Sequence, residues 1–343
     1  MWDDGDAALP VDSRLPAPAV DELLDALRPA FVVEATGARC ARRGAWPSED
    51  GDALVVPTSG TTGAPKGVVL THDAVRASAD ASNRRLDVEA SHDAWLSLLP
   101  VAHIGGLSVI TRSMLSATRL SFVIDDPGVS LVSVVPTQAN RLDLSRFRVV
   151  LVGGSSDWRQ RPANIVRTYG MTETGSGIAY DGRPLDGVEI RIDGAGEIHV
   201  RGPMLLRGYR DGSDPKDGEG WLATGDAGTF AGDGRLQVDG RIGDVIVTGG
   251  EKVWPAAVEK VMRTHEGVDD VAVAGRPDAE WGQRVSAWII PVDPTNPPGR
   301  DVLREHVKMT LPAYAAPQEV HIVEQFPRTA SGKVRRELLP DRR

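Results

Sequence analysis

The sequence has a single cysteine, no long apolar run and fewer basic than acidic residues. The lone Cys40 excludes a disulfide framework and a zinc site built on cysteines, and it suits a reducing compartment. No apolar run approaches the length of a membrane span, and the acidic residues 1–6 are unlike the basic start of a secretory signal. We therefore expect a cytoplasmic protein that does not insert into a membrane.

The charge balance also narrows the class of protein. A formal net charge of −9 argues against a general binder of nucleic acid or anionic membranes, although a local basic pocket for a nucleotide stays open. The hydrophobic share of 41% and the charged share of 25% are typical of a globular protein. With 343 residues, the chain can form two or three domains that each have a core.

Short runs rich in Val, Ile and Leu indicate how the chain is organised. An amphipathic helix beginning near residue 19 leads into a strand at 31–33. Strand-like and helical runs then alternate, which predicts a layered α/β region with a largely parallel sheet, at 95–99, 106–117, 119–124, 131–135 and 148–152. Four short strands follow between 188 and 238, which favours a β-rich subdomain.

From residue 241 the pattern changes to a small α+β unit. Helices are predicted at 255–262 and 301–310, and strands at 268–274, 284–290 and 318–323. The predicted fold is therefore a large N-terminal α/β domain with a β-rich subdomain over 1–240, and a small mobile α+β domain over 241–343.

Residues 57–67, with the sequence PTSGTTGAPKG, have the composition of a polyphosphate-binding loop. Glycines let backbone N–H groups converge on an anion, hydroxyls add donors, and Lys66 adds a positive charge. The usual nucleotide P-loop needs Gly before Lys and Ser or Thr after it, whereas Pro65 and Gly67 flank Lys66 here. By itself this loop is also compatible with an ordinary Gly/Ser/Thr turn.

Two further motifs follow predicted strands. Gly153-Gly154 follows the strand at 149–152, and residues 169–174, YGMTET, follow the run 165–168. Ligands of open α/β sheets bind outside the carboxyl ends of the strands, so both motifs suit one site. Glu173 could hold Mg²⁺, Thr172 could bond a phosphate oxygen, and Tyr169 offers a flat face to a base. Taken alone, Glu173 is better interpreted as a solvated loop carboxylate.

Three later motifs complete the set. Residues 224–226 (TGD) and 240–244 (GRIGD) supply a carboxylate and a guanidinium suited to ribose hydroxyls, although each alone reads as a turn or a surface ion pair. Residues 327–333 place Lys333 in a flexible loop, which alone reads as a solvated tail.

Taken in order, and with Gly249-Gly250-Glu251, these motifs resemble those of the adenylate-forming enzymes. That superfamily comprises acyl- and aryl-CoA ligases, amino-acid adenylation domains and luciferases. The resemblance covers the chain from about residue 50 onward. Within the superfamily, residues 169–174 and 179–188 are similar to the compact o-succinylbenzoate–CoA ligases (MenE) of menaquinone synthesis.

The resemblance implies an enzyme that uses ATP, Mg²⁺ and coenzyme A in two half-reactions, through an acyl-adenylate. It implies that Lys333 contacts the substrate carboxylate and the α-phosphate, and that Glu173 holds Mg²⁺. The β- and γ-phosphates would be held by Thr58, Ser59, Gly60, Thr61, Thr62, Gly63 and Lys66, with Thr172 nearby. The nucleoside would be held by Gly153, Gly154, Tyr169, Gly170, Asp226 and Arg241.

The second half-reaction implies a rotation of the small domain. Asp244 matches the family's hinge, and Gly249 and Gly250 match a segment lining the pantetheine tunnel, where a side chain would block passage. His103 matches a position that orients the carboxylate and gates the thiol. The alternative for His103 is a structural histidine at a helix start.

The acid-binding residues are the least defined part of the resemblance. Amino-acid-activating members carry an Asp just after the His103 position, and residues 104–108 contain none. Arg112 is our candidate for the second carboxylate of a dicarboxylic acid, with Ser176 beside it and Thr137 and Gln138 in nearby loops. An arginine that faces solvent or forms a structural ion pair is the alternative.

The chain departs from most members of the family. The region before the phosphate loop is abbreviated, and only residues 155–168 separate Gly154 from Tyr169. This leaves open whether the acid pocket has its usual floor or whether a second copy in a homo-oligomer supplies one. An aryl- or acyl-CoA ligase leads among the functions, with o-succinylbenzoate–CoA ligase as the preferred identity and another aryl- or acyl-CoA ligase as an alternative. A carrier-protein-loading adenylation enzyme and a non-catalytic nucleotide- or acyl-binding protein are the alternatives, and Lys66, Glu173 and Lys333 argue against the last.

Overall fold

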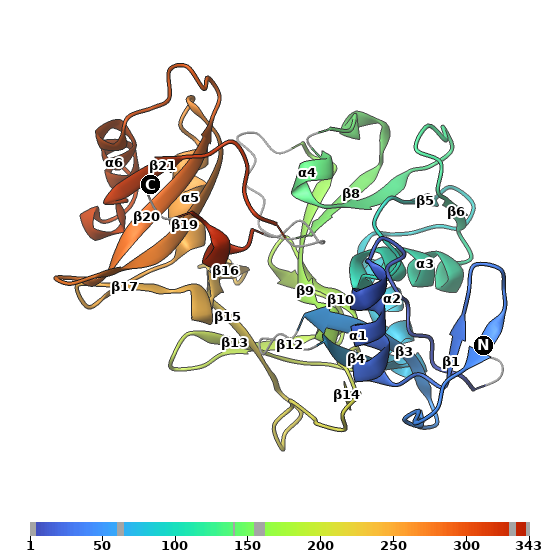
Figure 1. The fold of residues 1–343 in the computed structure, drawn as a ribbon. Helices are drawn as coiled ribbons and strands as arrows, with labels where there is room; N and C mark the ends of the chain where they lie inside the picture. Colours follow the sequence, from blue (N-terminus) through green and yellow to red (C-terminus); the bar gives the residue numbers. More distant parts are fainter. Residues whose placement is uncertain (1–4, 60–64, 140, 154–161, 329–333, 341–343) are drawn as a thin grey trace.

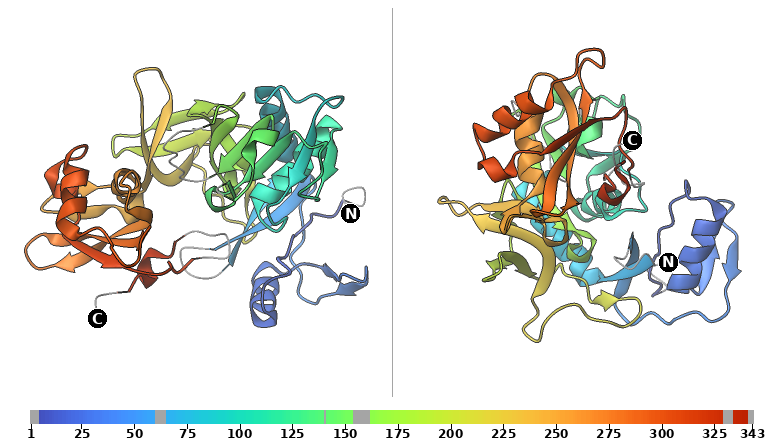
Figure 2. Two further views of the ribbon diagram at one scale, coloured as in Figure 1. Left: turned by 90° about the horizontal axis from the view of Figure 1, so that it is seen from above. Right: turned by 60° about the vertical axis from the view of Figure 1, so that its left-hand side comes forward.

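The computed structural model describes residues 5–59, 65–139, 141–153, 162–328 and 334–340. The views in Figures 1 and 2 show the small C-terminal part, in orange and red, standing beside a larger N-terminal part. Two separate hydrophobic cores account for this division. One is built on residues between Ala53 and Leu236, and the other on residues between Ile246 and Ala316.

A seven-stranded sheet forms the centre of the larger part, in the order β11-β10-β9-β8-β7-β5-β6. Its five consecutive parallel strands are β6 (Arg119–Ser121), β5 (Ala94–Ser97), β7 (Leu131–Val134), β8 (Val149–Gly153) and β9 (Ile165–Met171). The antiparallel strands β10 (Ser176–Tyr180) and β11 (Arg183–Pro184) complete one edge. The predicted α/β fold with a largely parallel sheet is therefore confirmed.

Helix α2 (His72–Arg85) covers this sheet together with α3 (Ile104–Ser116), and the sequence patterns did not predict it. Its buried face consists mostly of alanine and serine, among them Ala74, Ser78 and Ser82, with Val75 as its one larger apolar residue. A search for hydrophobic periodicity therefore misses it. Its start is nevertheless encoded locally, because the Thr71 hydroxyl accepts a hydrogen bond from the Ala74 N–H (3.1 Å).

A smaller sheet carries the phosphate motif. Strands β3 (Asp52–Ser59) and β4 (Pro65–Thr71) form an antiparallel hairpin in which Thr58 is paired with Lys66. The short β14 (Gly208–Tyr209) pairs with β4 on the other side. We expected residues 57–67 to form a loop after a strand. Instead, the strands continue to Ser59 and resume at Pro65, because both edges of the motif find ladder partners.

The N-terminal segment packs on this smaller sheet. Helix α1 (Ala17–Leu27) buries Leu23 and Leu27 against Val55 and Val69, and it leads into the hairpin of β1 (Phe31–Val33) and β2 (Arg39–Ala41). The predicted helix and the first strand are both present.

The predicted β-rich subdomain is a four-stranded antiparallel sheet. Its strands are β12 (Glu189–Ile192), β13 (Glu197–Arg201), β15 (Leu222–Phe230) and β16 (Leu236–Arg241). The motif TGD lies inside β15 and not in a turn.

The C-terminal part is the expected α+β unit. Helices α5 (Pro255–Arg263) and α6 (Arg300–Lys308) pack with a five-stranded sheet of β17 (Ile246–Thr248), β18 (Glu251–Val253), β19 (Val268–Asp278), β20 (Gly282–Pro291) and β21 (Glu319–Ile322). Pro255 opens α5 at a position where its missing N–H costs little. We keep 1–240 and 241–343 as the proposed domain division.

Candidate active site

The polar residues gather where β8 and β9 end. Gly153 and Thr168 are neighbours in the parallel ladder, and β9 passes through the 3-10 turn η3 (Thr172–Thr174) into β10. The Thr174 hydroxyl fastens this turn, because it accepts from the Met171 N–H (2.9 Å) and donates to the Ser176 carbonyl (2.6 Å). Ser176 has φ 139°, a region that non-glycine residues rarely occupy and that is concentrated at functional sites.

One end of this turn belongs to a nucleotide cluster of Tyr169, Asp226 and Arg241. The Tyr169 hydroxyl donates to Asp226 Oδ2 (3.0 Å), and Arg241 Nε lies 3.0 Å from Asp226 Oδ1. Asp226 and Arg241 face each other in the β15–β16 ladder. Burial and the neighbouring Asp226 raise the pKa of Tyr169 well above its usual range, so its hydroxyl stays a donor. Three residues predicted separately for the nucleoside therefore lie together.

The middle of the turn belongs to a phosphate cluster of Glu173, Lys66 and Tyr209. The Tyr209 hydroxyl donates to Glu173 Oε1 (3.2 Å), and Lys66 Nζ lies 4.9 Å from the centre of the Tyr209 ring. Burial and Glu173 raise the pKa of Tyr209 to about 12. Sequence reasoning missed Tyr209, since a single aromatic residue in a short glycine-flanked segment carries no motif. The cluster combines a hard-cation ligand with a phosphate-binding cation.

The far end of the turn belongs to an acid cluster of Arg112, Ser176 and Ser108. Arg112 Nη2 donates to Ser176 Oγ (2.9 Å), which in turn donates to Ser108 Oγ (3.1 Å). The guanidinium lies 5.7 Å over the ring of Trp95. Gln138, in α4 (Pro136–Ala139), is instead bonded to the backbone of its own loop and of Leu98.

Arg112 is buried, with 2% of its surface exposed, and its Nε has no hydrogen-bond partner. Across the part of the chain that the structure describes, no carboxylate lies within ion-pair distance of it. An isolated charge in the interior costs several kcal/mol, so the residue is expected to have an anionic partner. A carboxylate of the bound acid fits this requirement.

His103 is the N-cap residue of α3, and its side chain makes no capping hydrogen bond. Its Nε2 lies 3.7 Å from Asp12 Oδ2, and burial lowers the pKa of the imidazole. A neutral ring at pH 7 suits the orienting role that the resemblance implies.

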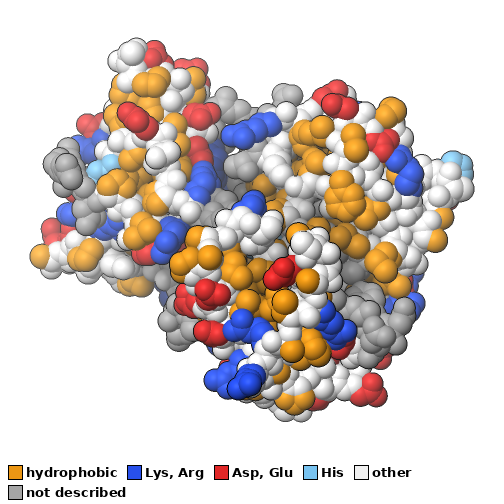
Figure 3. All heavy atoms as spheres, turned by 45° about the vertical axis from the view of Figure 1, so that its right-hand side comes forward, with side chains coloured by type: hydrophobic (Ala, Val, Ile, Leu, Met, Phe, Trp, Pro, Cys, Tyr) orange, Lys and Arg blue, Asp and Glu red, His pale blue; other side chains and the backbone are white. Residues whose placement is uncertain are grey.

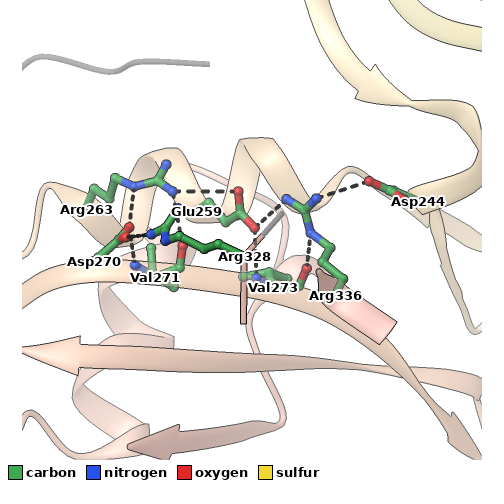
Figure 4. Close-up of polar contacts among 8 residues, drawn as sticks. All are labelled: Asp244, Glu259, Arg263, Asp270, Val271, Val273, Arg328 and Arg336. Atoms are coloured by element: carbon green, nitrogen blue, oxygen red, sulfur yellow. Dashed lines mark hydrogen bonds and ion pairs between the residues drawn. The ribbon is translucent and has the colours of Figure 1, made fainter. Parts of the chain in front are cut away.

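Asp244 and the glycine pair lie at the start of the small part. Asp244, the last residue of the turn η4 (Ile242–Asp244), is bound to Arg336 (3.1 Å), as Figure 4 shows. Gly249 and Gly250 form the turn between β17 and β18, with φ 58° and 86°. A Cβ on Gly249 would lie 2.7 Å from the ring of Trp281, so the turn excludes side chains there.

Several predicted residues lie outside the described part of the chain, namely Gly60, Thr61, Thr62, Gly63, Gly154 and Lys333, as does the side chain of Ser59. Their roles stay predictions. Thr58 is described, and its hydroxyl donates to the Lys66 carbonyl (3.4 Å). Thr172 begins the turn that carries Glu173, and Gly170 faces Gly177 in the β9–β10 ladder.

The face in Figure 3 carries acidic and basic side chains in mixed positions. No helix among the described residues is long and apolar enough to cross a membrane.

Three polar clusters lie on one turn, and a small C-terminal part follows in the chain. This arrangement is the one expected of an adenylate-forming enzyme. A family model described as "AMP-binding enzyme" matches residues 7–210, and one described as "AMP-binding enzyme C-terminal domain" matches residues 257–333. The chain belongs to this AMP-binding enzyme family. The match begins at residue 7, so it also covers the N-terminal segment in which the sequence motifs gave no signal.

Two similar proteins, one compared by sequence and one by structure, are named for the same substrate. The chain is 38% identical to a "Probable 2-succinylbenzoate–CoA ligase" of Mycobacterium tuberculosis, over 94% of this chain and 93% of the relative. It resembles o-succinylbenzoate CoA synthetase (MenE) of Bacillus subtilis in complex with the acyl-adenylate OSB-AMP (TM-score 0.73, 30% identity), over 84% of this chain and 69% of that one. The same B. subtilis enzyme with ATP and magnesium gives a TM-score of 0.73 at 29% identity, over 88% and 73%.

Proposed function

We propose that this chain is an ATP-dependent 2-succinylbenzoate–CoA ligase of menaquinone synthesis. It activates the acid as an acyl-adenylate and then transfers the acyl group to coenzyme A. The names of its relatives and the three clusters around residues 169–176 support this function.

The observation that carries the proposal is the buried Arg112 without a carboxylate partner. 2-Succinylbenzoate has two carboxylates, of which one reacts and the other must be bound as a spectator. A guanidinium can bind a carboxylate through two parallel hydrogen bonds, and Ser176 and Ser108 add hydroxyl groups beside it. A monocarboxylic acid would leave this charge uncompensated.

In the first half-reaction, a carboxylate oxygen of the acid bonds to the α-phosphorus of ATP while the bond to pyrophosphate breaks. The chain contributes positioning and charge, because there is little covalent chemistry for side chains to perform. Asp226 and Arg241 bind the ribose beside Tyr169, and Lys66 with the loop 58–63 binds the leaving phosphates. Glu173 would hold Mg²⁺, which neutralises phosphate charge when bound.

Two further residues act on the reacting groups in the same proposal. His103, kept neutral by its burial, orients the carboxylate. Lys333 contacts the carboxylate and the α-phosphate.

In the second half-reaction, the thiolate of coenzyme A bonds to the acyl carbon, and AMP leaves. The small domain turns about Asp244 to admit the thiol, and the turn at Gly249 and Gly250 lines its path. Both glycines have left-handed backbones that disfavour side chains, which suits a narrow passage.

ATP–pyrophosphate exchange over a panel of carboxylic acids tests this function. We expect exchange with 2-succinylbenzoate, followed by formation of its CoA thioester, and loss of exchange in Lys333→Ala. Exchange without transfer to CoA would indicate a carrier-protein-loading enzyme instead. No exchange with any acid would refute catalysis, and undiminished exchange in Lys333→Ala would refute the role of that lysine.

A matched substrate isolates the role of Arg112. The analogue of 2-succinylbenzoate that lacks the spectator carboxylate should be a poor substrate for the parent enzyme. Arg112→Met should remove this preference. Unchanged discrimination would place the spectator carboxylate elsewhere. The cytoplasmic location, the lack of a nucleic-acid partner and a possible homo-oligomer remain predictions.

A further inference from the structure

The abbreviated N-terminal segment reaches the candidate active site. Ala8 joins the edge of β3, where its N–H donates to the Ala53 carbonyl (2.9 Å) and its carbonyl accepts from the Val55 N–H (2.9 Å). The alternate apolar residues that follow, Leu9 and Val11, pack on the same core as α1. Backbone pairing and apolar contacts therefore fix the path of the chain immediately before Asp12.

Asp12 is held firmly at the end of this path. Its side chain is 8% exposed, and Arg14 Nε and Nη2 donate to its two oxygens at 2.9 and 2.6 Å. The Arg14 backbone N–H adds a third bond to Oδ1 (3.0 Å). These bonds lower the pKa of Asp12 to about 2, so it is a carboxylate throughout the neutral range. An aspartate with this many fixed donors has little rotational freedom.

Asp12 Oδ2, which accepts a hydrogen bond from Arg14 Nη2, also faces His103. Oδ2 lies 3.7 Å from His103 Nε2, which is buried and has no hydrogen-bond partner among the described residues. A buried imidazole nitrogen without a partner costs free energy, and a small shortening of this distance would satisfy it. The carboxylate would then fix the orientation of the ring and the tautomer with hydrogen on Nε2.

We propose that Asp12 is a positioning residue for His103, so that the short N-terminal arm completes the acid-binding side of the active site. The proposal rests on the proposed function for the role of His103 in catalysis. Nothing in the local sequence of Asp12 indicates this role, since the contact joins positions 91 residues apart.

The charged groups near His103 predict in which direction each substitution shifts the pKa of its imidazole. Besides burial, which lowers the pKa of the imidazole, Asp12 raises it and Arg14 lowers it. Asp12→Asn should therefore lower the pKa of His103, whereas Arg14→Gln should raise it. A purely structural role for the Asp12–Arg14 pair would instead give both variants the same effect.

The pKa and tautomer of His103 can be read from the ¹⁵N resonances of its ring in the full chain, assigned with His103→Asn. Asp6→Asn is the matched control, because Asp6 lies in the same segment and pairs with Arg39 away from His103 (2.8 Å). We expect no change in this control. An unchanged pKa and tautomer in Asp12→Asn, or equal shifts in Asp12→Asn and Arg14→Gln, would overturn the proposal.

Kinetics provide a second, independent readout. Asp12→Asn should lower kcat/KM for adenylation by roughly 10-fold through a misplaced imidazole, and it should have no further effect in a His103→Ala background. Additive losses would contradict a role through His103. If the parent enzyme forms no adenylate at all, the proposed function fails, whereas the ring resonances still decide whether Asp12 controls His103.

Discussion

Replacing Arg336 by Met should destabilise the small C-terminal domain. Arg336 donates to Glu259 Oε1 (2.8 Å), to Asp244 Oδ2 (3.1 Å) and to the Val273 carbonyl (3.0 Å), as drawn in Figure 4. Glu259 is 4% exposed, so the substitution leaves an anion in the interior. Removing one partner of a buried ion pair costs about 3–5 kcal/mol.

Two features place the expected loss at or below the lower end of this range. Glu259 keeps the Val273 N–H (2.8 Å) and a second guanidinium, that of Arg263, at 3.8 Å. The Arg336 side chain is also 29% exposed, so water screens part of the interaction. We therefore expect a loss of about 2–3 kcal/mol in the free energy of opening the domain.

Hydrogen exchange of the intact chain measures this effect. Peptides from α5 and β19 should exchange faster in Arg336→Met by the factor that corresponds to the lost free energy, while peptides from the parallel sheet should not. Arg335→Met is the matched control, because its exposed side chain pairs with Glu337 on the surface (2.9 Å).

A double variant tests whether the loss of stability comes from the unpaired charge of Glu259. Glu259→Gln combined with Arg336→Met removes both charges and retains the acceptor for the Val273 N–H, so most of the stability should return. A loss below about 1 kcal/mol in the single variant, or a double variant less stable than the single one, would refute the buried-charge account.

Three other substitutions test the site. Asp226→Asn should raise the KM for ATP roughly 10- to 100-fold, because it removes a charged acceptor from Tyr169 and from the ribose; an unchanged KM in pyrophosphate exchange would exclude this role. Tyr209→Phe should raise the Mg²⁺ concentration for half-maximal adenylation several-fold, since Glu173 loses its hydroxyl donor; an unaltered Mg²⁺ dependence would contradict it. Gly170→Ala would place a Cβ 2.1 Å from a backbone carbonyl, so it should lower the thermal unfolding midpoint, and an unchanged midpoint would show that the strands can separate there.

Elements with strong hydrophobic periodicity were predictable, whereas those built from small residues were not. The parallel strands, α5 and the small-domain sheet are present near their predicted positions. Helix α2 was missed because it buries alanine and serine against its neighbours. The boundaries of the phosphate motif were wrong for a different reason. Its two flanks became strands because they pair with each other as a hairpin, with Thr58 opposite Lys66, whereas the Gly/Ser/Thr-rich composition of the segment predicts a loop.

Some residues of the site were likewise predictable from the sequence, and others were not. Contiguous motifs predicted binding roles for Glu173, Asp226 and Arg241, because the chemistry of phosphate and ribose binding needs these residue types in fixed short patterns. Tyr209 and Asp12 belong to no motif. Each gains its role from a contact between distant segments, 36 residues apart for Tyr209 and Glu173.

The sequence by itself determined the class of chemistry, because five motifs in a fixed order predict which residues bind ATP and the acid. Only the tertiary structure decided which of those residues lie in the same cluster and which of them lack a partner for a buried polar group. Burial is the physical reason. The sequence of Arg112 is also compatible with a cation on the surface. In the structure it is buried away from water, and no carboxylate among the described residues pairs with it. A bound anion is therefore its expected partner.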